Sequence, residues 1–454
     1  MSFRVLLIQP RIYDFSAFDL WVRPLGWLNL AARLRSAGAE VAWVDAVDRF
    51  QPAAADLPTP SHHLQFFGCG HYHREFINKP EILSWVPRRY KVYGLPRDRF
   101  LSLLASQEKP DVILTGCTMT YWYPGVLEAV QMVRSLWPGV PVGIAGIYAI
   151  LCGDHARQYS GADFVYSNSN MNELVKTVAS LAGHSPREQI ESVIVSPAYD
   201  LLGSQKSLPL QTSTGCPFDC TYCASKKLSP LFRQFPKETL LKMIQECVER
   251  YGTTDWAFYD DALLIGKEKH FIPLMEALID RGYGFRLHSP NALHCRMIDR
   301  QVAQLMKAVG FRTVRLGLEF AQADRQNSTG GKVSWKDFTD AIRHLREAGF
   351  TAGELGTYVM AGHPEQTLEE VAETCLRVHD QGCPVRLTLY SPIPGTVDFA
   401  RLDSSWQMDP STDPLLHNPS LAPYRAGSLY ADRFKSLQEK VLELNRTLGG
   451  DSKG

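Results

Sequence analysis

Three cysteines, Cys216, Cys220 and Cys223, stand in one short segment with the spacing Cys-x-x-x-Cys-x-x-Cys. Their thiolates are soft ligands that suit iron–sulfur clusters and zinc, and a short loop can direct all three at one centre. A structural zinc site needs a fourth ligand, but no Cys or His follows nearby, and Cys247 falls within a predicted helix. A four-iron cluster held by three cysteines leaves one iron open to a small molecule. The spacing therefore favours such a cluster over zinc or three unrelated buried cysteines.

Aromatic and apolar residues surround these cysteines. Pro217 and Phe218 add an apolar wall, Tyr222 precedes the last cysteine, and residues 208–213 before the loop have the pattern of a strand. On these features the loop resembles the cluster loop of the radical S-adenosylmethionine (radical SAM) superfamily. The resemblance implies that the open iron binds SAM. It also implies that one electron cleaves SAM to methionine and a 5′-deoxyadenosyl radical, which takes a hydrogen atom from the substrate.

The composition limits the class of protein. At 454 residues the chain is long enough for more than one domain. Its 48 basic and 48 acidic residues give a net charge of zero, so there is no electrostatic case for binding nucleic acid or an anionic membrane. Ten scattered cysteines and the lack of a signal peptide predict a reducing, cytoplasmic location. The longest uncharged run, between Arg134 and Asp154, is interrupted by prolines and glycines and predicts strand and loop rather than a membrane span.

Strands and helices alternate from residue 208 onward, which predicts parallel βα units. The radical SAM core is a partial barrel of six such units, open on one side, so the resemblance implies a (β/α)6 partial barrel. The predicted helices are residues 237–251, 267–281, 299–309, 334–348 and 368–381. The six predicted strands are residues 208–213, 256–260, 284–288, 313–319, 356–360 and 385–390.

Polar residues follow several of these strands, at the ends where barrel enzymes place their chemistry. By the resemblance, the carboxylates after the second strand accept from the SAM ammonium, and Glu319 meets the ribose or amino group. The chain departs from its relatives by having Tyr259-Asp-Asp261 in place of Gly-Gly-Glu and Ala361-Gly-His-Pro-Glu365 in place of Gly-x-Pro-Gly. No residue is assigned a catalytic role. The residues expected to bind SAM are Phe218, Tyr222, Asp260, Asp261, Ser289, Asn291, Glu319, His363 and Pro392.

The N-terminal part has a similar alternation of short apolar strands and helices. Such a pattern predicts a doubly wound parallel sheet of the Rossmann type, which binds its ligand at the carboxyl ends of the strands. The helices are predicted at residues 24–37 and 124–136. The strands are predicted at residues 3–10, 41–45, 111–116, 140–145 and 162–166.

Small residues follow two of these strands, where they would let a large ligand approach the backbone. With the first strand, these segments resemble the cobalamin-binding domain that precedes the barrel in many radical SAM enzymes; the alternative is a Rossmann-like domain that has lost its ligand. The motif Asp-x-His-x-x-Gly, which supplies a histidine below cobalt, is missing, since His155 follows Gly153 by two residues. We therefore expect no histidine below cobalt. The residues expected to bind cobalamin are Thr115, Gly116, Thr118, Met119, Thr120, Tyr121, Gly143, Gly146, Ile147 and Tyr148.

An insert at residues 50–100 does not follow the strand–helix rhythm. It contains Cys69-Gly-His-Tyr-His73, a weak metal-ligand pattern, and the basic and aromatic run Pro87–Tyr93. A long insert beside a strand-end crevice is frequently functional, which favours a lid that contacts substrate; the alternative is a solvated basic face. The predicted domains are residues 1–183 with this insert, a linker at 184–207, the radical SAM core at 208–400, and a C-terminal extension at 401–454 with a helix near 431–448.

The predicted function is a cobalamin-dependent radical SAM C-methyltransferase. A second hypothesis keeps the radical SAM core for a rearrangement or cyclisation and makes the N-terminal domain a scaffold or substrate clamp. A third, a non-catalytic iron–sulfur or corrinoid carrier, does not explain the polar residues at the barrel strand ends. The partners implied are a small-molecule or peptide substrate and a reductant such as ferredoxin or flavodoxin. The sequence identifies neither the substrate nor the oligomeric state.

Overall fold

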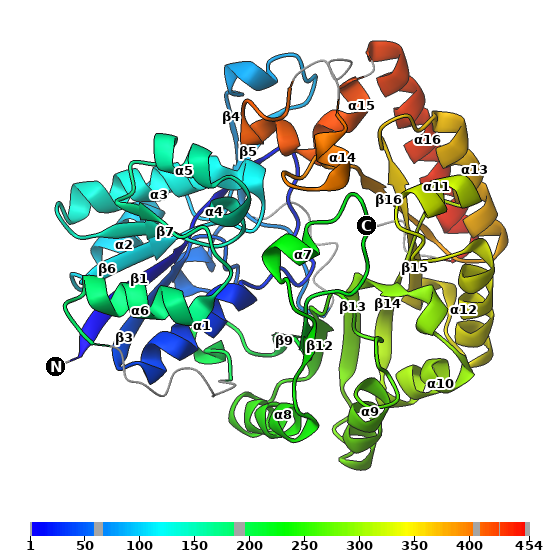
Figure 1. Cartoon of the computed structure of the whole chain (residues 1–454), viewed down its shortest axis with the longest axis horizontal. Coiled ribbons are helices and arrows are strands. Elements are labelled where there is room, and N and C mark those ends of the chain that lie inside the picture. Colours follow the sequence, from blue (N-terminus) through cyan, green and yellow to red (C-terminus); the bar gives the residue numbers. More distant parts are fainter. Residues whose placement is uncertain (1, 59–66, 186–195, 403–408, 426, 450–454) are drawn as a thin grey trace. The chain divides into compact units, whose positions relative to one another are not determined.

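The computed structural model describes residues 2–58, 67–185, 196–402, 409–425 and 427–449 (Figure 1). The chain divides into two compact units. Unit 1 is Met1–Gln205 together with Pro410–His417, and unit 2 is Lys206–Asp409 together with Asn418–Gly454. The C-terminal 45 residues or so are thus shared between the two units.

Unit 1 is built on a five-stranded sheet in which every neighbouring pair is parallel. The central strand, Val112–Thr115, is buried along its whole length, as expected for a parallel sheet with helices on both faces. The strand order, second–first–third–fourth–fifth, is that of the flavodoxin-like doubly wound sheets, so the predicted doubly wound architecture is confirmed. In sheet order, the strands are β3 (Ala39–Asp45), β1 (Phe3–Gln9), β6 (Val112–Thr115), β7 (Val142–Ile144) and β8 (Phe164–Val165).

Alternate residues of β1 enter two separate cores. Val5 and Leu7 pack with helices on one face of the sheet, and Leu6 and Ile8 pack with helices on the other. The first face is covered by α1 (Leu25–Ser36) and α6 (Met171–Leu181), and the second by α2 (Arg97–Ala105) and α3 (Tyr123–Leu136). Two short helices, α4 (Ile147–Leu151) and α5 (Gly153–Tyr159), connect β7 to β8.

Two short segments of the insert at residues 50–100 belong to a small antiparallel sheet. Strand β5 (Tyr90–Tyr93) lies in the middle, between β2 (Ile12–Asp14) and β4 (Arg74–Ile77). The pairing of β2 with β5 therefore joins the insert to the N-terminal segment. Most of the insert lies between these two strands in the sequence.

Unit 2 contains a six-stranded sheet, and all of its neighbouring strands are parallel. The two edge strands are β16 and β9, so the sheet is open, as the predicted partial (β/α)6 barrel requires. The strands in sheet order are β16 (Val385–Leu389), β15 (Leu355–Ala361), β14 (Phe311–Glu319), β13 (Arg286–His294), β12 (Asp255–Phe258) and β9 (Ser207–Leu210). The main helices are α8 (Lys237–Tyr251), α9 (Phe271–Asp280), α10 (Arg300–Val309), α12 (Trp335–Glu347) and α13 (Leu368–Asp380).

The C-terminal helix α16 (Ser428–Thr447) packs beside α13 and the edge strand β16. Asn445 is buried there and both accepts from the Val385 amide at 2.8 Å and donates to the Val385 carbonyl at 2.9 Å. Its side-chain amide thus satisfies backbone groups that a further strand would otherwise bond. None of the helices in the described part of the chain is long and apolar enough to cross a membrane.

Candidate functional site

The three cysteines lie on a loop that follows β9 and the short strand β10 (Ser213–Thr214) and ends at α7 (Ser225–Leu228). Gly215 opens the loop with a φ of +74°, and a Cβ there would lie 2.6 Å from the Leu231 carbonyl oxygen, so only glycine fits. Burial raises the pKa of the Cys216 and Cys220 thiols, and the neighbouring cysteines raise it further. Ligation, rather than solvent, would therefore have to stabilise the thiolates of Cys216 and Cys220, whereas Cys223 is exposed.

A site for one metal ion places requirements on the side chains that surround it. A zinc ion draws its ligands to about 2.0–2.3 Å from one point. Within the described ranges, no group of three or more His, Cys, Asp or Glu side chains is placed to hold a single metal ion. This also applies to Cys69, His71 and His73 of the insert, where Cys69 is fully buried.

A partly buried lysine, Lys332, lies beside the loop. Its ammonium donates to Glu319 at 2.9 Å and sits 5.7 Å from the ring centroid of Tyr222, within the range of a cation–π contact. Burial by itself would lower the pKa of Lys332, but Glu319 and other neighbours outweigh it and raise the pKa well above that of an ordinary lysine. The same ammonium acts on the Cys220 thiol and opposes the rise in its pKa. A fixed positive charge therefore stands next to the cysteine loop.

Glu319 is held in an uncommon backbone conformation at the carboxyl end of β14. Its φ is +65°, and the pairing of β14 with β15 shifts register between Gly317 and Glu319. A non-glycine residue in this left-handed region costs about 1–3 kcal/mol and is concentrated at functional sites. The bulge and the strain together turn the Glu319 side chain toward Lys332, and Glu319 is buried there.

Asp260, after β12, anchors the chain that leads into the cysteine loop. Its carboxylate accepts from the Thr212 amide and hydroxyl at 3.0 and 2.7 Å and from the Ser213 hydroxyl at 2.6 Å. Burial raises the pKa of Asp260 to about 6 against the opposing effect of these bonds. Asp261 is exposed and acts electrostatically on Cys216. Burial raises the pKa of Asp261, against the opposing effect of its bond with Ser225. Of the two predicted carboxylates, Asp261 is the more exposed.

Ser289 and Asn291 lie within β13, which continues to His294 through a register shift between Ser289 and Leu293. Ser289 is buried, and its hydroxyl donates to the Thr313 carbonyl and accepts from the Arg315 amide, both at 3.3 Å. Asn291 is exposed and donates to the carbonyl oxygens of Tyr259 and Asp260. Bulges of this kind re-aim side chains near sites; here the bulge ties β13 to the segment that contains the two aspartates.

His363 links the loop after β15 to the cysteine loop through Asp398. Its Nε2 is 2.8 Å from the Asp398 carboxylate, which also accepts from the Thr221 hydroxyl at 2.9 Å. Burial by itself would raise the pKa of Asp398, but the bonds from His363 and Thr221 outweigh it and lower the pKa. Thr221 lies between two of the cysteines, so this chain of hydrogen bonds fixes the loop from a second side.

Aromatic residues complete the surroundings of the loop. The Phe218 ring stacks on His294 with centroids 4.4 Å apart, and burial lowers the pKa of His294 to about 4, so this ring is neutral at pH 7. Tyr222 packs against a small core of Phe320, Met360 and Tyr390. Pro392 is buried in the loop that follows Tyr390. Seven of the nine residues predicted to bind SAM follow or end strands of the unit 2 sheet or lie on the cysteine loop, whereas Ser289 and Asn291, predicted to follow a strand, lie within β13. Their contacts with SAM stay predictions.

In unit 1, several of the residues predicted to bind cobalamin are engaged within the protein. A Cβ on Gly116 would lie 2.0 Å from the Ala145 carbonyl oxygen, and one on Gly143 would collide with the Phe164 ring, so internal packing accounts for both glycines. The remaining engaged residues are buried: Thr115 donates to the Ile8 carbonyl, Thr120 bonds His417, Tyr148 bonds His155, and Tyr121 lies in the core.

Other strand-end residues of unit 1 have polar side-chain atoms without a hydrogen-bond partner among the described residues. The side-chain oxygens of Gln9, at the end of β1, and Thr118, after β6, are buried and have no hydrogen-bond partner in the described part of the chain. Gly146 has a φ of +86°, and a Cβ on it would meet nothing closer than the Cys117 carbonyl oxygen at 3.9 Å. Strands β1 and β6 are neighbours at the point where the strand order reverses, which is where doubly wound sheets bind ligands. Unpartnered polar atoms and a backbone open to close approach fit a ligand rich in amides, such as cobalamin.

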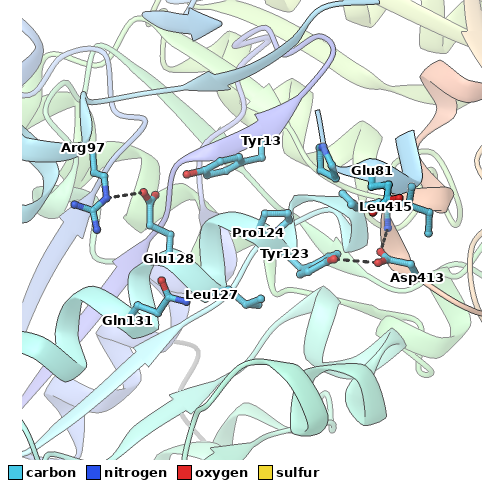
Figure 2. Close-up of a pocket in the computed structure, with 12 residues that line it drawn as sticks. Tyr13, Glu81, Arg97, Tyr123, Pro124, Leu127, Glu128, Gln131, Asp413 and Leu415 are labelled. Atoms are coloured by element: carbon cyan, nitrogen blue, oxygen red, sulfur yellow. Dashed lines mark hydrogen bonds and ion pairs between the residues drawn. The ribbon is translucent and has the colours of Figure 1, made fainter. Parts of the chain in front are cut away.

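Unit 1 also contains a cavity of about 430 Å³ beside α3 (Figure 2). Its polar side chains are largely paired already. Glu128 accepts from the Arg11 Nε at 2.8 Å and lies 3.6 Å from Arg97, and the Tyr123 hydroxyl donates to Asp413 at 3.2 Å. The cavity therefore offers a ligand few free polar partners, in contrast to the strand ends.

Sequence reasoning missed Lys332, His294 and Asp398 in unit 2. None of them directly follows a predicted strand, so the strand-end rule does not select them. Lys332 does follow Gly330-Gly331, where a Cβ on Gly330 would lie 2.7 Å from the Asp219 carbonyl oxygen. A glycine pair followed by a cation was the one signal in the sequence for a tight turn against the cysteine loop.

Residues 210–378 match the family model described as the radical SAM superfamily. An uncharacterized methyltransferase of Pyrococcus horikoshii is 26% identical over 249 residues, which cover 51% of this chain and 53% of that protein. An anaerobic magnesium-protoporphyrin IX monomethyl ester cyclase of Rubrivivax gelatinosus is 22% identical over 382 residues, covering 81% of this chain and 64% of that protein. The chain thus spans less than two thirds of the length of these curated relatives.

Among solved structures, the radical SAM methyltransferase TsrM of Kitasatospora setae has a similar fold. The structure with tryptophan substrate and a SAM analogue aligns with a TM-score of 0.64 at 14% identity, covering 87% of this chain and 75% of that one. The same enzyme has been solved with cobalamin and a [4Fe–4S] cluster bound. The likeness extends over both units, whereas the family match contains the three cysteines, Glu319 and Lys332. The part of this chain that carries the cysteine loop, residues 210–378, is thus a radical SAM domain.

Proposed function

We propose that this protein is a cobalamin-dependent radical SAM enzyme that transfers a methyl group to a carbon atom of a small-molecule or peptide substrate. The observation that carries the proposal is the three-cysteine loop at the carboxyl end of the unit 2 sheet, fixed from two sides by hydrogen bonds and flanked by a partly buried lysine. When bound, the cluster and SAM supply one-electron chemistry, and cobalamin supplies a methyl group.

The residues of unit 2 would hold the cluster and position SAM. Cys216, Cys220 and Cys223 would ligate three irons, and the fourth would be left to SAM. Glu319 and the exposed Asp261 would accept hydrogen bonds from the hydroxyl and ammonium groups of SAM, while Lys332 balances the charge of Glu319. Asp260 would not contact SAM itself, because its carboxylate is bonded to the segment that leads into the cysteine loop and orients that segment.

The residues of unit 1 would hold cobalamin at the strand-order reversal. Gln9 and Thr118 would supply polar contacts, and Gly146 would allow close approach to the backbone. His155 has its Nδ1 2.7 Å from the Tyr148 hydroxyl and lies in α5, outside the motif that supplies a histidine to cobalt. In this proposal, therefore, no histidine binds cobalt from below.

A second candidate, a radical cyclisation, has one observation in its favour. The cyclase of Rubrivivax gelatinosus matches over 81% of this chain, which includes most of both units. Methyl transfer ranks first because the methyltransferase of Pyrococcus horikoshii matches at the higher identity and because the unpartnered atoms of unit 1 fit a corrinoid.

The experiment that separates the candidates is anaerobic purification and reconstitution, followed by assays for iron, sulfide and corrinoid. The expected result is one [4Fe–4S] cluster and one corrinoid per chain, with 5′-deoxyadenosine formed from SAM once a strong reductant is present. A physiological reductant would be a ferredoxin or flavodoxin. A chain that holds the cluster and cleaves SAM but retains no corrinoid would favour the cyclisation.

The state of cobalt tests the structural detail. The electron paramagnetic resonance spectrum of the protein with cob(II)alamin is expected to lack the nitrogen triplet of an axial base. The His155→Ala variant should give the same spectrum. A triplet that disappears in this variant would identify His155 as the ligand and contradict the proposed empty face.

A further inference from the structure

One strand of the insert sheet presents an exposed aromatic ring among cations. Phe76 in β4 is 57% exposed. The Arg89 guanidinium lies 5.1 Å and the Lys91 ammonium 6.0 Å from its ring centroid. Arg74 precedes Phe76 by two residues and so points to the same face of the strand. We call Arg74, Phe76, Arg88, Arg89 and Lys91 the Phe76 patch.

The arginines of this patch lack carboxylate partners among the described residues, whereas Asp14 acts electrostatically on Lys91. Arg74, Arg88 and Arg89 have no carboxylate partner among the residues that the structure describes. Arg88 lies 5.7 Å from the centroid of the buried Phe15 ring, which places it on the same side of the sheet as Lys91, whose ammonium donates to the Phe15 carbonyl. Burial lowers the pKa of Lys91, and the nearby Arg74 and Arg88 lower it further. The patch is therefore a site of crowded positive charge.

The same strand has an open backbone edge. In the order β2–β5–β4, strand β4 pairs on one side only. Gly94 donates to the His73 carbonyl at 2.9 Å, so the alternate residues Glu75 and Ile77 exchange their backbone bonds with β5. The backbone groups of Arg74 and Phe76 then face outward, and no described residue bonds to them. Such an edge is a template for a further strand.

We propose that β4 binds an extended acidic peptide, which adds to the insert sheet as a fourth strand. Directly opposed side chains of neighbouring strands lie about 4.5–5.5 Å apart, so a carboxylate would stand opposite Arg74 and an apolar side chain opposite Phe76. A peptide of this kind carries acidic and apolar residues in alternation along one face.

Two observations favour a peptide over single-stranded nucleic acid as the occupant. Nucleic-acid platforms stack successive bases on several exposed rings, whereas this patch exposes one. The outward amide and carbonyl groups of β4 match the backbone of a peptide strand, because they alternate with the period of a strand.

The test is fluorescence anisotropy with full-length protein and a labelled octapeptide, Glu-Thr-Val-Thr-Glu-Thr-Val-Thr. The double variant Arg74→Glu/Arg89→Glu should weaken binding by at least about tenfold, since lost bonds to charged groups cost about 1.5–3 kcal/mol. Phe76→Ala should weaken it several-fold. The matched control is Arg250→Glu, because Arg250 is an exposed arginine 5.1 Å from the Tyr251 ring centroid on a helix, with no open strand edge; it should leave binding unchanged. Far-ultraviolet circular dichroism checks that each variant is folded.

Backbone pairing is tested separately with two N-methylated forms of the octapeptide. One is methylated on the amides of its glutamate and valine residues and the other on those of its threonines. Only every second amide of an added strand faces its neighbour, so one form should lose binding and the other keep it. Equal affinities of the two forms would overturn strand addition. The proposal is also wrong if the peptide does not bind saturably, or if an oligothymidylate binds more tightly with the same dependence on Arg74 and Arg89.

Discussion

The carboxyl ends of the two parallel sheets carry polar side chains that differ in how they are paired. In unit 2, Glu319 bonds Lys332 at 2.9 Å, and His363 bonds Asp398 at 2.8 Å. In unit 1, the buried oxygen of Thr118 has no partner within the described residues, as is also true of Gln9.

This difference indicates two ways of preparing a ligand site. Leaving a buried polar group without a partner costs about 1–3 kcal/mol of folding free energy. Two groups that already bond each other would incur this cost on separation, so they keep their geometry before a ligand binds. The polar groups of unit 2 are paired in this way. The cysteine loop is held before any ligand binds by the hydrogen bonds of Thr221 and Asp260. In unit 1 the ligand itself would supply the missing partners, so binding there should stabilise the unit more than its apo contacts suggest.

The largest effect is expected at the cysteine loop. Replacing Cys216, Cys220 and Cys223 together by alanine should remove all iron and sulfide from the reconstituted protein, because no thiolate remains to ligate the cluster. The measurements are metal analysis and the broad visible absorption of the cluster. Cys247→Ala is the control, since Cys247 is buried in α8 away from the loop. A triple variant with full iron content would refute the assignment.

The next largest effect is expected when the ion pair between Lys332 and Glu319 in unit 2 is broken. Lys332→Met leaves the Glu319 carboxylate buried without its cation, which should lower the free energy of unfolding by about 3–5 kcal/mol. Urea unfolding of the apoprotein measures it. The control is Lys307→Met, which removes a more exposed partner of Glu354 and should cost about 1 kcal/mol or less.

The double variant Lys332→Met/Glu319→Gln should recover much of this loss, because it removes the uncompensated charge as well. If Lys332→Met costs no more than Lys307→Met, the pair does not prepare the site as described.

The affinity for SAM should change by a smaller amount. Glu319→Gln should weaken SAM binding by about 1.5–3 kcal/mol, the value of a lost hydrogen bond to a charged group. Isothermal titration calorimetry of the reconstituted protein measures this change. The substitution also leaves Lys332 without its carboxylate, so the double variant is needed for interpretation. If Glu319 contacts SAM directly, the double variant binds as weakly as Glu319→Gln; a return of affinity would instead attribute the loss to Lys332.

Local patterns in the sequence predicted the elements of both sheets because apolar periodicity and breakers act over a few residues. Residues 140–145 were expected as a strand, and β7 occupies Val142–Ile144; all six unit 2 strands lie where the pattern placed them, although β13 runs on to His294. The cysteine spacing likewise identified the loop from one segment.

Contacts between distant segments were not accessible in this way. The Lys332–Glu319 pair depends on a turn that follows the strand by several residues, and the Asp398–Thr221 bond joins positions 177 residues apart. The pairing of β2 with β5 and the place of Pro410–His417 in unit 1 depend on tertiary packing. Periodicity contains no information on such pairings, so the small sheet formed by β2, β5 and β4 was not predicted, and the role of the insert as a lid stays a prediction.

The smallest predicted effect tests unit 1, where the hydroxyls of Thr118 and Thr115 differ in their hydrogen bonding. Thr115 donates its hydroxyl to the Ile8 carbonyl at 3.2 Å, whereas the Thr118 oxygen is buried without a partner. Thr115→Val should therefore lower the free energy of unfolding of the apoprotein by about 0.5–1.5 kcal/mol. Thr118→Val should leave it unchanged or raise it slightly, because a methyl group replaces a hydroxyl that bonds nothing.

The order should reverse when cobalamin retention is measured by equilibrium dialysis. Thr118→Val removes a hydrogen bond that the ligand would complete, so retention should weaken by about 0.5–1.5 kcal/mol, or about two- to tenfold. Thr115→Val should have little effect on retention, because its hydroxyl is already used within the sheet. Equal effects of the two variants in both assays would mean that the unpartnered oxygen of Thr118 is not part of a ligand site, and the contrast between the two sheets would then have no functional meaning at this position.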